Sequence, residues 1–118
     1  MSIQNPIVII RGDTRTVNCH LYKIVNGERY DYPIGVAATA KVSLMKEDGT
    51  NLELTSAGGT VTFTDRAHGL LNFSVSGTNS LLLKKAERQN VLIAITDTGA
   101  TLTWKLKGIL TVEDPGFE

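Results

Sequence analysis

Two histidines and one cysteine are the side chains best suited to nucleophilic or metal chemistry here, and their spacing supports neither. Cys19 and His20 are neighbours in a stretch that alternates apolar and polar residues. On a strand they point to opposite faces, so they cannot form a thiolate–imidazole pair. His68 lies in a turn-like sequence, and no Cys or His pair has zinc-site spacing. We interpret both histidines as surface residues and Cys19 as a small core residue.

Two further patterns resemble binding motifs but favour turns. Arg11-Gly12-Asp13 spells the tripeptide that integrins bind, yet it directly follows an apolar run, where Gly and Asp favour a bend. Four aspartates at or beside turns are more typical of Asx turns than of a calcium site: Asp48, Asp65, Asp97 and Asp114. No glycine-rich phosphate loop occurs. The sequence therefore predicts no catalytic residue, cofactor or metal ion, and a protein that is not an enzyme.

The segment Asn26–Pro33 is the most polar and aromatic loop that the sequence predicts. Arg29, Tyr30 and Tyr32 lie within four residues of one another, and Tyr and Arg are enriched at binding hot spots. The alternative is that Tyr30 or Tyr32 folds back over the edge of the core with its hydroxyl in water. Arg29, Tyr30 and Tyr32 are therefore candidate protein-interaction residues, with both interpretations open.

Period-two alternation of apolar and polar residues predicts the strands that position these side chains. Asp-Gly and Gly-Gly turn signals separate the runs. About eight strands are expected, over residues 7–10, 15–23, 37–46, 51–55, 60–64, 70–75, 90–96 and 101–112, the last broken near Gly108. Asn90–Thr96 is almost continuously apolar, as in a central strand covered on both faces. One short helical turn is expected near residues 78–87.

The apolar face of these strands predicts the core of a sandwich or barrel. Its expected members are Val17, Cys19, Leu21, Val42, Leu44, Phe73, Val75, Val91, Ile93, Ile95, Leu102, Trp104 and Leu106. Trp104 is expected to face the core together with Leu102 and Leu106.

Length and charge narrow the class of protein. The chain has 118 residues, a length that suits one domain over residues 1–118. Twelve Lys and Arg balance twelve Asp and Glu, and this zero net charge argues against a general nucleic-acid or anionic-membrane binder. No apolar run approaches the roughly 20 residues that cross a bilayer, and the first residues lack a secretion signal. We expect a soluble domain made in a reducing cytoplasm.

The order of landmarks resembles the N-terminal domain family of phage baseplate upper proteins. These landmarks include Ile9–Thr14, Asn26-Gly27 with Pro33, Glu47–Thr50, Thr64-Asp65 with Gly69, Ile95–Gly99 and Gly108–Glu113. The resemblance implies an all-β, immunoglobulin-like antiparallel β-sandwich from a tailed-phage or prophage virion. The paired cysteines of an antibody domain are missing.

Two functions follow as hypotheses. The first is a non-enzymatic structural module of a virion baseplate, tail or head, which binds other virion proteins and forms a homo-oligomer, without nucleic acid or membrane. The second is an adhesin-like or carbohydrate-binding module, although sugar binding normally uses exposed aromatic platforms and aromatic residues are few.

Overall fold

Two sheets, antiparallel in all but one strand pair, pack face to face and enclose the apolar side chains in this computed structural model, which describes residues 2–3 and 7–116. The elements in chain order are β1 (Ser2–Ile3), β2 (Ile7–Ile10), β3 (Arg15–His20), β4 (Tyr22–Val25), β5 (Glu28–Asp31), β6 (Thr39–Met45), β7 (Asn51–Thr55), β8 (Val61–Asp65), the 3-10 turn η1 (Arg66–His68), β9 (Leu70–Val75), α1 (Gly77–Ser80), β10 (Ala86–Asp97) and β11 (Ala100–Glu113). The predicted all-β sandwich is confirmed.

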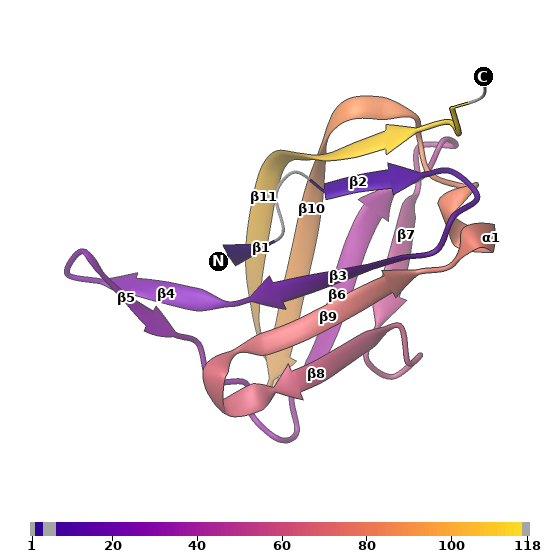
Figure 1. Ribbon diagram of the computed structural model, residues 1–118. Helices are drawn as coiled ribbons and strands as arrows, with labels where there is room; N and C mark the ends of the chain where they lie inside the picture. The colour runs from indigo at the N-terminus through magenta and orange to yellow at the C-terminus, as the bar shows by residue number, and fades with distance from the viewer. Residues whose placement is uncertain (1, 4–6, 117–118) are drawn as a thin grey trace.

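The strand order is that of an immunoglobulin-like sandwich. One sheet has the order β1-β3-β9-β8 and the other β2-β11-β10-β6-β7. The first corresponds to the A-B-E-D sheet of that fold, and β11-β10-β6-β7 correspond to its G-F-C-C′ strands, with β2 added at the edge. All pairs are antiparallel except β2 with β11. A separate two-stranded hairpin, β4–β5, lies between β3 and β6 in the chain and projects from the body of the sandwich (Figure 1).

Several predicted elements differ in their limits. The predicted strand 15–23 divides at the buried Leu21 into β3 and β4. The predicted helical turn near residues 78–87 is wrong in extent, because α1 covers only Gly77–Ser80 and β10 already begins at Ala86. Ser76 caps this turn by accepting a hydrogen bond from the Asn79 amide at 3.2 Å. The Lys and Glu that favoured a helix therefore lie in extended chain.

The core contains ten of the thirteen residues expected there, with Phe73 fully buried on the central strand β9. Leu102 is a correction: it faces the interior side of its sheet, yet 51% of its surface is exposed. Trp104 and Leu106 are only half-buried. Trp104 and Leu106 still pack against the margin of the core, whereas Leu102, nearer the start of β11, does not.

Strand β10 is central in its sheet but is not covered on both faces. It pairs with β11 on one side and β6 on the other. Val91, Ile93 and Ile95 are buried, whereas the alternate residues Leu92 and Ala94 are half-exposed on the outer face. The apolar outer face therefore meets solvent instead of a second layer.

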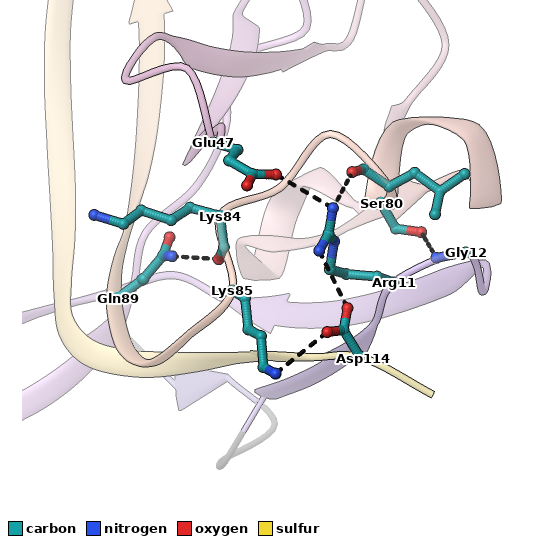
Figure 2. A network of polar contacts seen from close by, with 9 residues as sticks. Arg11, Gly12, Glu47, Ser80, Lys84, Lys85, Gln89 and Asp114 are labelled. Atoms are coloured by element: carbon teal, nitrogen blue, oxygen red, sulfur yellow. Dashed lines mark hydrogen bonds and ion pairs between the residues drawn. The ribbon is translucent and has the colours of Figure 1, made fainter. Parts of the chain in front are cut away.

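The Arg11 side chain connects the C-terminal ends of β2 and β11 to the segment after α1 (Figure 2). Its guanidinium donates to the Asp114 carboxylate at 3.1 Å, to the Glu47 carboxylate at 3.3 Å and to the Leu81 carbonyl at 3.0 Å. The Gly12 amide donates to the Ser80 hydroxyl at 2.8 Å. The Arg11-Gly12-Asp13 tripeptide thus forms part of a structural corner, with the arginine side chain engaged.

Candidate interaction surface

The predicted Asn26–Pro33 loop is in part a β-strand. Residues 22–25 pair with residues 28–31 in regular antiparallel register, from Tyr22 opposite Asp31 to Val25 opposite Glu28. Asn26 and Gly27 both have positive φ, 52° and 79°, as a two-residue type I′ turn requires. Figure 1 shows that this hairpin continues the direction of β3 and projects beyond β11, away from the sandwich.

Backbone hydrogen bonds hold the base of the hairpin against the sandwich. The Leu21 amide donates to the Gly69 carbonyl at 2.8 Å, and the Tyr32 amide donates to the Leu21 carbonyl at 3.0 Å. Gly69 has φ of 73°, and a Cβ there would lie 2.6 Å from both the Leu21 and Tyr32 carbonyl oxygens. Only glycine fits this junction without displacing backbone.

Side chains add a second set of contacts at the base. The Tyr32 ring packs edge-on against the Trp104 ring with centroids 4.9 Å apart. The Trp104 indole donates to the Tyr22 carbonyl at 3.4 Å. His20 and Asp31, at the ends of β3 and β5, lie 2.8 Å apart between Nε2 and Oδ1. The hairpin is therefore fixed at its base and free at its tip.

The three candidate interaction residues do not lie on one face. Arg29 stacks on Tyr22, with its guanidinium carbon 4.2 Å from the ring centroid. Tyr30 lies on the opposite face, where its hydroxyl donates to the Glu28 carboxylate at 2.8 Å. This hydrogen bond raises the pKa of the Tyr30 phenol. Tyr32 contacts Trp104 and is half-buried, so Tyr30 is the exposed aromatic residue of the hairpin.

Alternation along β5 connects Tyr30 with the base. Side chains alternate between the two faces of a strand, so residues 28, 30 and 32 point to one face. Cross-strand pairing places Val25 on the same face as Glu28. Val25 and Tyr30 are 45% and 47% exposed. This face therefore continues from the tip of the hairpin to the Tyr32–Trp104 contact.

Sequence reasoning missed the part of the surface that β11 contributes. Leu102, Trp104 and Leu106 follow one another on the interior side of β11, opposite Ile95, Ile93 and Val91. We define the hairpin–edge surface as Val25, Tyr30, Tyr32, Leu102, Trp104 and Leu106. Alternation marks Leu102, Trp104 and Leu106 as one face of a strand, but no local pattern shows that this face meets the hairpin, which is distant in the sequence.

Titratable groups elsewhere form local pairs. The Asp65 carboxylate accepts from the His68 ring at 2.8 Å, which raises the pKa of His68 and lowers that of Asp65. Burial raises the pKa of the Cys19 thiol to about 12. Within residues 2–3 and 7–116, no three His, Cys, Asp or Glu side chains cluster as metal ligands would.

Comparisons with protein-family models and with curated proteins find no match to this sequence. None of the helices in the described part of the chain has the length and apolar character needed to cross a membrane.

Proposed function

We propose that this protein is a non-enzymatic assembly module of a tailed-phage or prophage virion, which acts by binding further copies of itself and other virion proteins. The observation that carries the proposal is the projecting hairpin. One face of its free end exposes Val25 and Tyr30, with 45% and 47% of their surfaces accessible. Exposed apolar residues that gather on a projecting element are typical of interaction sites.

The position of the hairpin favours a role in binding a partner over a role in stabilising the fold. Its base is fixed by the Leu21, Tyr32 and Trp104 contacts, whereas its tip contributes no residue to the core. A rigid base lowers the entropy lost when the tip is immobilised by a partner. Zero net charge reduces long-range repulsion between copies of the chain.

The aromatic residues favour protein contact over sugar binding. A saccharide platform needs a flat, accessible ring, but Tyr22 lies under Arg29 and Tyr32 lies against Trp104. Tyr30 is the most exposed of the three tyrosines. It lies opposite Lys23 and beside Val25 and Glu28, and such a mixed apolar and charged face suits a protein surface better than a saccharide.

Sedimentation velocity of Tyr30→Ser tests the proposal, with Ile24→Ser as the matched control on the opposite hairpin face. We expect the wild type to self-associate and Tyr30→Ser to weaken association by about 2 kcal/mol, a hot-spot effect. Ile24→Ser should associate much like the wild type. Tyr32 is left unchanged, because its contact with Trp104 supports the fold. A wild type that stays monomeric up to millimolar concentration would contradict self-association.

Labelling of purified particles tests the virion assignment separately. An antibody raised against the chain should decorate intact particles of the phage that encodes it. Intact particles that carry none of the protein would contradict the assignment.

A further inference from the structure

Strand β11 has a free backbone edge along its lower half. β2 pairs with β11 only from Leu110 to Glu113. Two irregularities in the β10–β11 register, between Ala86 and Val91, bend the upper part of β11 toward β2. At Gly108, φ is 62°, and the Gly108 amide donates to the Asn90 side chain at 3.0 Å. Within the described residues, β10 is therefore the only strand whose backbone pairs with residues 100–107, although Tyr22 of β4 contacts the Trp104 side chain.

The turn that precedes β11 fixes which backbone groups face this edge. Thr98 and Gly99 have positive φ, 49° and 81°, so Asp97 and Ala100 close a two-residue type I′ turn and exchange both hydrogen bonds. Hydrogen-bonded pairs then recur at every second residue. Leu102, Trp104 and Leu106 thus direct their amides toward β10, whereas Thr101, Thr103 and Lys105 direct theirs to the free edge.

A side-chain contact agrees with this assignment. The hydroxyl oxygens of Thr96 and Thr101 lie 2.8 Å apart. These residues are directly opposite each other, and non-hydrogen-bonded pairs bring facing side chains closest together. The outward amides of β11 are consequently available to a further strand.

We propose that this free edge pairs antiparallel with the same edge of a second copy, about a two-fold axis at Trp104. The inference rests on the proposed self-association and adds a second contact to it, separate from the tip of the hairpin. In this register Thr103 of each copy lies opposite Lys105 of the other, and Thr101 lies opposite Lys107. The two five-stranded sheets join into one continuous sheet, the isologous contact that a two-fold dimer requires.

Charge and apolar matching favour a second copy in this register. On the outer face each lysine meets a threonine, whereas an axis at Lys105 would set two lysines directly opposite each other. On the interior face Leu102, 51% exposed, meets Leu106 of the second copy. The pairing therefore covers Leu102, which the sequence places in the core but which is exposed in the monomer.

Three substitutions at Thr103 test the register by sedimentation equilibrium. Thr103 is exposed on the outer face, so Thr103→Glu, Thr103→Lys and the neutral control Thr103→Gln should all keep the monomer fold. Relative to Thr103→Gln, Thr103→Glu should tighten the dimer and Thr103→Lys should weaken it. Each change should be about 2- to 30-fold, because the pair with Lys105 occurs twice across the axis. If Glu and Lys both weaken the dimer, or neither changes it, the register is wrong.

Amide hydrogen exchange tests the backbone pairing independently of side chains. In wild-type protein, a rise in concentration should slow exchange at Thr103 and Lys105, while Leu102 and Trp104 stay protected throughout. Val61, whose amide faces the free edge of β8 because Thr60 and Ser74 form a hydrogen-bonded pair, serves as an internal control whose rate should not change. A dimer in which Thr103 and Lys105 still exchange rapidly would overturn edge pairing and leave hairpin-mediated assembly standing. A wild type that remains monomeric would overturn both.

Discussion

Truncation of Phe73 gives the sharpest test of the sandwich core. Phe73 is fully buried on β9, the strand between β3 and β8, where it lies opposite Val17 on one side and Val61 on the other. Both neighbours belong to regular strands, so the cavity left by Phe73→Ala cannot readily collapse. We expect a loss of about 3–5 kcal/mol, the range for buried Phe to Ala.

Urea denaturation monitored by Trp104 fluorescence measures this loss. With a slope of about 1.5 kcal/mol per molar, the midpoint should fall by roughly 2–3 M. Val36→Ala is the matched control, because Val36 is 90% exposed and should change stability by less than about 0.5 kcal/mol. If Phe73→Ala does not fold, Phe73→Leu should still fold with a smaller loss. A loss below about 1 kcal/mol for the alanine variant would refute the burial of Phe73.

Three other predictions concern polar and titratable groups. Arg11→Met should destabilise the protein by about 1–3 kcal/mol in thermal denaturation, since it removes charged hydrogen bonds at a partly buried site. The control Asp13→Ala, at an exposed position, should have little effect. Equal losses for the two variants would contradict the structural role of the Arg11 side chain. The NMR titration midpoint of His68 should exceed its ordinary 6.5, and Asp65→Asn should return it there. Because the pKa of His68 is raised on folding, its contribution to stability is complete below about pH 6.5 and is lost as pH rises through the folded pKa; a midpoint unchanged by Asp65→Asn would contradict the pairing. Cys19, with its pKa raised to about 12, should react with a thiol reagent at pH 8 only after unfolding, and rapid labelling of native protein would contradict its burial.

Much of the sandwich could be predicted because one face of each strand is buried. Val17, Val42 and Phe73 alternate with polar neighbours, and burial of one face fixes this period. Leu102 follows the same period but lies on a strand segment without a covering layer. Alternation identifies which face a side chain occupies, and the extent of the opposing sheet decides whether that face is covered.

The Asn26-Gly27 pair makes the hairpin partly predictable from the sequence. Asn26-Gly27 is a strong type I′ turn pair, and the observed strands β4 and β5 flank it symmetrically. Both strands are largely exposed, so neither shows the burial-driven alternation that marked the others. The contact between Tyr32 and Trp104 joins residues far apart in the chain, and no local pattern could predict it.

Sedimentation velocity of the wild-type chain over micromolar to millimolar concentration tests the assembly function most directly. The projecting hairpin, its exposed Val25–Tyr30 face and the free edge of β11 predict a sedimentation coefficient that rises with concentration. They also predict that Tyr30→Ser shifts this rise to higher concentration while Ile24→Ser leaves it in place. A single monomeric boundary at every concentration, or equal effects of the two substitutions, would contradict assembly through this surface.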